Sequence, residues 1–108
     1  MNENELEWDD LSIKEFTDLQ KFAYVTQKAI DNDYIGYCYR ENSELKIDSG
    51  WRFLFGDEEE DYLDNPNNTI TKDLKEIVEW KPAIKEILKA YPGQDFEWDN
   101  EKQTFVRI

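Results

Sequence analysis

The pattern of hydrophobic and polar residues predicts strands in the first half of the chain. Residues 22–26 (FAYVT) are mostly β-branched or aromatic, which is typical of a strand. Segments 34–41 (YIGYCYRE) and 49–56 (SGWRFLFG) alternate with a period of two, the periodicity of a strand. The alternating sets are Ile35, Tyr37 and Tyr39, then Trp51, Phe53 and Phe55. The short connection between these two segments predicts that they pair as antiparallel neighbours.

Other segments have the capping signals or the spacing of short helices. Ser12 followed by Glu15 forms a capping box, which predicts a helix from about Ile13 to Leu19. Residues 27–33 (QKAIDND) are consistent with one helical turn. After the turn-rich residues 64–68, an i, i+3, i+4 spacing occurs twice, in Leu74, Ile77 and Val78 and again in Ile84, Ile87 and Leu88. Pro82 separates the two sets, so the pattern predicts two short helices.

The end of the chain predicts a closing hairpin. The segments FEW (96–98) and TFVRI (104–108) are joined by polar residues. Strands, then helices, then a hairpin indicate an α+β fold with a mainly antiparallel sheet of about five strands and two or three short helices packed on one face. We expect a single domain over residues 22–108, preceded by an acidic N-terminal extension with a short helix over residues 1–21.

The charge of the chain limits its possible partners. It contains 13 basic and 26 acidic residues, for a net charge of −13, and residues 1–64 hold 18 of the acids but only six of the bases. Nucleic acids and anionic membranes are disfavoured as partners, because binding phosphates requires clustered Lys and Arg. A basic protein is a compatible partner, although solubility alone also explains an acidic surface.

Nothing in the chain predicts catalysis, a metal site or a cofactor. There is no His and a single Cys, Cys38, which we expect to be a buried, inert thiol. No Gly-rich phosphate loop and no zinc-type Cys/His set is present. The first ten residues lack the basic and apolar regions of a signal peptide, and no apolar stretch approaches the roughly 20 residues of a membrane helix. We expect a cytoplasmic protein.

The acidic segment at 57–64 contains six acids in eight residues, directly after the most aromatic predicted strand. One interpretation is a solvated loop, as charge runs commonly are. A calcium loop is rejected, because Tyr62 stands where glycine is required and Asn68 stands where a bidentate glutamate is required. The third interpretation is a strip that binds the Lys and Arg side chains of a protein partner.

Two residues of the preceding strand have alternative roles. Arg52 is expected to pair with a carboxylate on the solvent face, or else to hold Asp57 or Glu58 in place or to touch a ligand. Trp51 is expected in the core, or else on the surface as a binding residue. The predicted partner-binding residues are Asp48, Trp51, Arg52, Asp57, Glu58, Glu59, Glu60, Asp61 and Tyr62.

The segments 34–41 and 48–68 resemble a bacterial family, the immunity protein 33 family of polymorphic toxin systems. Its members look like "GY-YRE", then "DSGWRF-GDE", then helices with the pattern "L--I----P-I---L". The matching residues here are Gly36, Tyr37, Tyr39, Arg40 and Glu41, then Asp48 to Phe53 and Gly56 to Glu58, then Leu74, Ile77, Pro82, Ile84 and Leu88. The resemblance extends from about Phe22 to Ile108.

This resemblance implies a small cytoplasmic protein that binds and neutralises a cognate toxin, and it carries over no catalytic residue. Acidic residues would steer a basic toxin, and aromatic anchors such as Trp51 and Tyr62 would supply affinity. Two alternatives remain open. One is a module that binds a small ligand near Arg40 and Arg52, and the other is a domain whose family motif serves folding alone.

Overall fold

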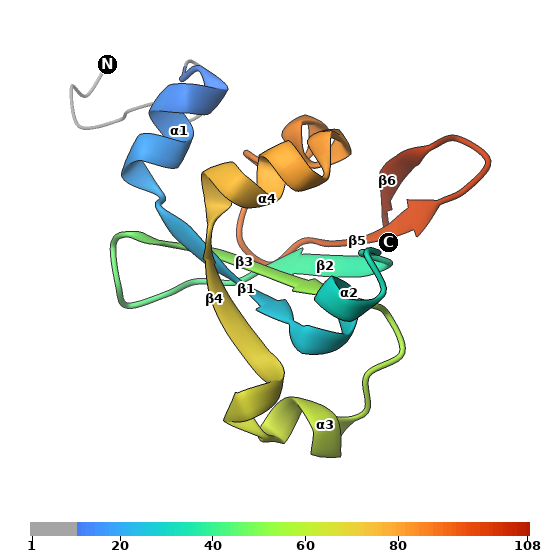
Figure 1. Ribbon diagram of the computed structural model, residues 1–108. Helices are drawn as coiled ribbons and strands as arrows, with labels where there is room; N and C mark the ends of the chain where they lie inside the picture. The colour runs from blue at the N-terminus through green and yellow to red at the C-terminus, as the bar shows by residue number, and fades with distance from the viewer. Residues whose placement is uncertain (1–10) are drawn as a thin grey trace.

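The protein forms one mixed six-stranded sheet, seen in a computed structural model that describes residues 11–108 (Figure 1). The strand order is β4-β1-β3-β2-β5-β6. The central pair β1 and β3 is parallel, and all other neighbours are antiparallel. The strands are β1 (Phe22–Thr26), β2 (Tyr37–Arg40), β3 (Asp48–Leu54), β4 (Thr69–Asp73), β5 (Asp95–Asp99) and β6 (Thr104–Arg107).

Within residues 11–108, four α-helices and two 3₁₀ segments accompany the sheet. They are α1 (Ile13–Leu19), α2 (Gln27–Asp31), α3 (Glu60–Asp64), η2 (Pro66–Asn68), α4 (Leu74–Trp80) and η3 (Pro82–Glu86). Helices α1 and α4, with the segment that follows α4, lie on one side of the sheet, whereas α3 lies at the far end of β4 (Figure 1). No helix within residues 11–108 is long and apolar enough to cross a membrane.

The core lies between the sheet and the helices on that side. Trp51 and Phe53 of β3 are fully or almost fully buried there, as is Phe16 of α1. Around them pack the other buried apolar residues of the strands and helices, which include Ala23, Val25, Cys38, Leu74, Ile77, Ile84, Leu88, Phe96 and Phe105. The α+β class, the mainly antiparallel sheet and the closing hairpin are thus as predicted.

The N-terminal helix is also where the capping box predicts it. Ser12 accepts a hydrogen bond from the Glu15 amide, and the Glu15 side chain accepts one from the Ser12 amide. Phe16 on this helix is buried in the core, although it belongs to the predicted extension over residues 1–21. The first ten residues of that extension lie outside the described residues.

The region between β3 and α4 differs most from the prediction. Residues 60–64 form helix α3 instead of a loop, and β4 is a sixth strand that the hydrophobic pattern did not reveal. Ile70 is the one apolar side chain of β4, so the strand has no visible alternation. The strand forms because its backbone pairs with β1, through hydrogen bonds that do not depend on side-chain type.

The second helix after the turn is a 3₁₀ segment, η3, and not an α-helix. Successive i→i+3 bonds join Ile84 to Lys81, Ile87 to Ile84 and Ala90 to Ile87. Pro82 stands at its first turn, where no amide donor is needed.

Candidate functional site

The face of the sheet away from α1 and α4 carries tyrosines and charged residues. The register aligns Thr71, Tyr24, Arg52, Tyr39 and Asp95 in one row across five strands. The next row contains Leu54, Tyr37, Glu97 and Val106. We call the following residues the tyrosine face: Tyr24, Tyr37, Tyr39, Arg52, Leu54, Asp95 and Glu97. All three tyrosines of this face are half-buried, so their rings are partly open to solvent.

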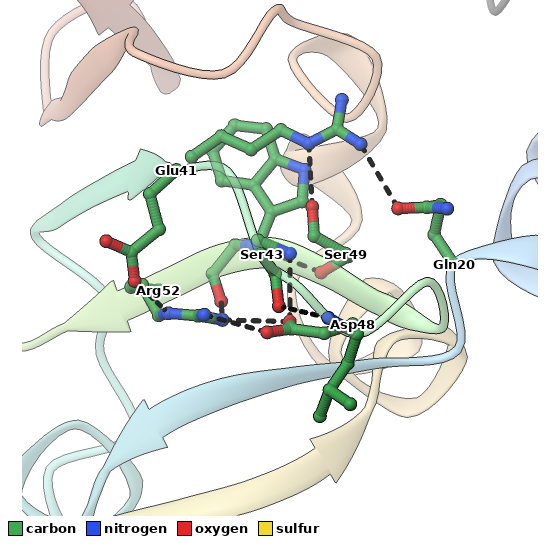
Figure 2. Close-up of polar contacts among 10 residues, drawn as sticks. Gln20, Glu41, Ser43, Asp48, Ser49 and Arg52 are labelled. Carbon is green, nitrogen blue, oxygen red and sulfur yellow. Dashed lines mark hydrogen bonds and ion pairs between the residues drawn. The ribbon is translucent and has the colours of Figure 1, made fainter.

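Arg52 lies at the centre of the tyrosine face. Its guanidinium carbon is 4.2 Å from the centroid of the Tyr24 ring, a cation–π contact. Its Nη2 is 2.8 Å from Asp48 Oδ2, and its Nε is 2.7 Å from Glu41 Oε2. Figure 2 shows the guanidinium held between these two carboxylates. The prediction that Arg52 pairs with a carboxylate on this face is confirmed.

The partners of Arg52 are not the acids of the segment that follows it. The alternative role, in which Arg52 would hold Asp57 or Glu58, is wrong, because Asp48 and Glu41 occupy its donors. Asp48 itself is almost inaccessible, with 2 % of its side chain exposed. It is therefore a structural residue and not available to a partner, contrary to its place among the predicted partner-binding residues.

Both members of the Arg52–Asp48 pair are held in their charged forms. Burial would raise the pKa of Asp48, but hydrogen bonds from Arg52 and from the Gly50 amide outweigh it and lower the pKa. Burial would lower the pKa of Arg52, but the bonds to Asp48 and Glu41 outweigh it and raise the pKa. The pair therefore stays ionised at neutral pH.

The segment Asp48-Ser49-Gly50 fixes the start of β3. Asp48 Oδ1 accepts a hydrogen bond from the Gly50 amide, and Ser49 Oγ accepts one from the Trp51 amide (Figure 2). Gly50 has a φ of +83°, and a Cβ atom there would lie 2.0 Å from the carbonyl oxygen of Glu41. The positive φ and the lack of space for a Cβ atom both require glycine at this position. The close backbone approach that the sequence suggested at Gly50 leads to the same conclusion.

Arg40 lies on the opposite, buried face of the sheet. Its Nε donates to the Ser49 carbonyl at 2.7 Å, and its Nη1 donates to the Ala90 carbonyl at 2.8 Å. The guanidinium also reaches the Gln20 side chain and stacks 5.2 Å from the Phe16 ring centroid. Burial lowers the pKa of Arg40. Because Arg40 and Arg52 point to opposite faces and serve internal partners, they do not form a shared ligand site.

Tyr37 and Tyr39 form an aromatic pair on β2. Their ring centroids are 5.9 Å apart, and the Tyr37 hydroxyl donates a hydrogen bond to Asp95 on the neighbouring strand. The pKa of each tyrosine is raised, first by burial and then by the nearby carboxylates. Both hydroxyls therefore remain protonated at neutral pH and can donate hydrogen bonds.

A hollow of about 230 Å³ lies beside the rings of Tyr24 and Tyr39 on the tyrosine face. It is lined by Tyr24, Tyr39, Arg52, Leu54 and, from α3, Leu63, among others. Leu63 is 39 % exposed, so α3 adds an apolar side chain to the edge of the hollow. The tyrosine face and α3 therefore form one continuous surface.

The acidic segment is ordered, and its residues have two different roles. Asp57 forms an ion pair with Lys28 at 2.6 Å, and the Tyr62 hydroxyl accepts a hydrogen bond from the Lys28 amide at 2.9 Å. These contacts fasten the segment to α2. Four further acids are exposed to solvent, namely Glu59, Glu60, Asp61 and Asp64. We call these four the α3 acids.

Glu58 turns inward instead of facing solvent. Its Oε2 accepts hydrogen bonds from Thr26 Oγ1 at 2.5 Å and the Phe55 amide at 2.7 Å, and its Oε1 accepts one from the Gly56 amide at 2.8 Å. Burial opposes ionisation, but these bonds outweigh it and lower the pKa of Glu58. Glu58 anchors the turn between β3 and α3.

The Glu58→Gln variant is expected to lose about 1–3 kcal/mol of unfolding free energy at pH 7, because the amide group cannot accept from three donors. A lowered pKa means that the contribution is complete above the ordinary value of 4.5 and is lost as the pH falls through the folded-state pKa. Urea unfolding at pH 7 and pH 3 should therefore show a difference from wild type that shrinks in acid. Glu59→Gln, at an exposed position, is the matched control, and equal losses in both variants would contradict this role.

Trp51 is fully buried, with 0 % of its surface exposed. Its indole Nε1 donates to the Leu88 carbonyl at 2.9 Å, and its ring stacks on Phe53 with centroids 5.6 Å apart. Trp51 is therefore a core residue and cannot be the surface anchor for a partner. The sequence interpretation that placed it in the core is the one confirmed.

Cys38 is also buried, and burial raises the pKa of its thiol, as expected for an inert side chain. Within residues 11–108, no group of three or more Cys, Asp and Glu side chains is arranged to hold a metal ion.

Sequence reasoning missed the tyrosine face as a unit. The period-two alternation of residues 37–40 placed Tyr37 and Tyr39 together, but it gave no sign of Asp95 and Glu97, which lie more than fifty residues later. Only strand pairing brings these four side chains together.

Comparison with known proteins identifies a family for most of the chain. Residues 23–108 match the Immunity protein Imm33 domain, a span that includes all six strands apart from Phe22. No curated protein and no solved structure matches the chain. The matched span covers the DSGWRF segment, whose Asp48, Gly50, Trp51 and Arg52 hold the start of β3. The chain therefore belongs to the Imm33 family of immunity proteins, with an immunity role against a toxin.

Proposed function

We propose that this immunity protein neutralises its toxin by binding it directly, without catalysis, and that the tyrosine face together with the α3 acids is the binding surface. The partner is a toxin with a basic surface, and the complex forms in the cytoplasm. One observation supports this more than any other. The tyrosine face combines partly open aromatic rings with acidic side chains. Arg52 is the one basic residue among those that define this face, and it already forms ion pairs with Asp48 and Glu41.

The composition of this surface suits a protein partner. Tyrosine rings supply large contact areas with a polar tip, and they are frequent at the centres of interfaces. Leu63 adds exposed apolar area beside the hollow, which the largely buried Leu54 also lines. The carboxylates of Glu41, Asp95 and Glu97 surround the rings, an arrangement that resembles the apolar centre and polar rim of an interface.

The α3 acids act at longer range. They lie exposed next to Leu63, at the edge of the hollow, so they carry negative charge beside the rings. Opposite charges accelerate the encounter of two proteins, and salt screens this effect. Tyr62 keeps α3 in place through the Lys28 amide and is a candidate contact residue.

The test uses candidate toxins taken from the proteins encoded by genes that neighbour this protein's gene. Co-expression is expected to restore growth, and the two chains are expected to co-purify. Failure to rescue growth or to bind would contradict the proposal.

Neutralising three of the α3 acids, in Glu59→Gln/Glu60→Gln/Asp61→Asn, is expected to slow association with that toxin about tenfold at low ionic strength. The dependence of the rate on salt should also become weaker. Stopped-flow or surface-binding kinetics measure both quantities. The matched control neutralises three exposed acids elsewhere, Glu76, Glu79 and Glu101, and should associate nearly as fast as wild type. Equal association rates for the two triple variants would mean that the α3 acids do not steer the toxin.

A further inference from the structure

We propose that Tyr37, Tyr39, Asp95 and Glu97 form a site for one arginine side chain of the bound toxin. This inference rests on the proposed function and names the chemistry that the tyrosine face recognises. We call these four residues the cation site. They come from the neighbouring strands β2 and β5, where the register places Tyr37 opposite Glu97 and Tyr39 opposite Asp95.

The protein's own Arg52 shows how this face holds a guanidinium group. Arg52 stacks on Tyr24 at 4.2 Å and is aligned with Tyr39 on its other side. Two carboxylates, Asp48 and Glu41, accept its N–H groups at 2.8 and 2.7 Å. A tyrosine ring and a pair of carboxylates thus hold this arginine, together with the Trp51 carbonyl, which accepts from Nη1 at 3.0 Å.

The cation site repeats that composition one strand further along the sheet. It has two rings 5.9 Å apart and two carboxylates on the adjacent strand. Within residues 11–108, neither Asp95 nor Glu97 has an ion-pair partner, whereas the acids around Arg52 do. Carboxylates beside tyrosine rings therefore bind a guanidinium group at Arg52, whereas the similar group of residues on β2 and β5 has no cation within the described residues.

The site is also held in position before a partner arrives. The Tyr37 hydroxyl donates a hydrogen bond to Asp95, which fixes this carboxylate beside the rings. Glu97, on β5, is exposed and can pair with an incoming charge. A planar guanidinium can stack on a tyrosine and pair with a carboxylate at the same time, which an ammonium group does less well. An arginine of the toxin is therefore favoured over a lysine.

A double-mutant cycle with the toxin identified by the co-expression test probes this site. Glu97→Gln and Tyr39→Leu are each expected to weaken binding about tenfold or more, and each arginine of the toxin is replaced by alanine in turn. One toxin arginine should be coupled to both positions, so that its loss removes most of the effect of Glu97→Gln. Replacing that arginine by lysine should restore only part of the affinity.

The controls separate this site from the wider proposal. Glu76→Gln, an exposed acid on α4, should bind like wild type, and thermal unfolding checks that each variant is folded. If Glu97→Gln and Tyr39→Leu are folded and bind like wild type while the triple α3 variant binds more slowly, the cation site is refuted and the proposed function stands. If both weaken binding without coupling to any toxin arginine, the site is likewise refuted. If the wild-type protein does not bind the toxin, the proposed function fails and the cation site with it.

Discussion

Replacing Arg52 with methionine is expected to lower the free energy of unfolding by about 3–5 kcal/mol, because it leaves the buried carboxylate of Asp48 without its counter-ion. Methionine preserves much of the side-chain volume, so the loss reports mainly on the charge. Asp48 has 2 % of its side chain exposed, and water cannot replace the two N–H donors that Arg52 provides. Urea unfolding at neutral pH measures the loss.

Two further variants show whether the unpaired charge is the cause. Arg52→Met combined with Asp48→Asn should be more stable than Arg52→Met alone, because the amide carries no charge to desolvate. Glu41→Gln, which affects the partner with 49 % of its side chain exposed, should cost less than about 1 kcal/mol. A loss below 1 kcal/mol in Arg52→Met would show that Asp48 is satisfied without its partner.

The second large effect is expected from Trp51→Ala, which should destabilise the protein by about 3–5 kcal/mol by opening a cavity in the core. The ring is fully buried between Phe53 and Phe96, and its removal also leaves the Leu88 carbonyl without a donor. Thermal or urea unfolding measures this loss.

Trp51→Phe distinguishes a structural role from a binding role. It should be less destabilising than alanine, and the folded variant should bind the toxin with nearly the affinity of wild type. A large loss of affinity at unchanged stability would instead mean that Trp51 acts at the interface. The absence of exposed Trp51 surface argues for the structural outcome.

These two effects bear on what the family motif does. Asp48, Gly50, Trp51 and Arg52 all have internal partners or internal steric reasons for their identity. In the part of the chain that the structure describes, no buried side-chain nitrogen or oxygen lacks a hydrogen-bond partner. Asp48, Gly50 and Trp51 therefore build the fold, and Arg52, which belongs to the tyrosine face, also holds Asp48. The rest of the surface proposed to bind the toxin lies beside this segment, on the tyrosines, β5 and the α3 acids.

The sequence predicted the helices and strands that are specified by neighbouring residues. The capping box at Ser12 and Glu15 located α1, and the alternation in residues 49–56 located β3, which runs from Asp48 to Leu54. Strand β4 was missed because its order comes from pairing with β1, and the η3 segment was predicted as an α-helix because both have similar apolar spacing. These errors concern segments that are stabilised by tertiary contacts more than by their own residues.

The candidate site was predicted only in part, for a similar reason. The exposed acids at 59–61 and the pairing of Arg52 with a carboxylate were anticipated, whereas Trp51 and Asp48 proved to be buried. Period-two alternation shows which side chains share a face of a strand, but not which face the helices cover. That choice decides whether Trp51 or Tyr39 is open to solvent.

By itself, the sequence determined the strongly acidic character of the protein, its short helices and strands, and its family, because charge, periodicity and motif are written in neighbouring residues. Only the tertiary structure decided that β1 and β3 are parallel, that Arg52 joins Asp48 and Glu41, and that Tyr39 meets Asp95. The physical reason is that these contacts join residues distant in the chain. They depend on strand order and on the side of the sheet that the helices bury, which no local pattern encodes.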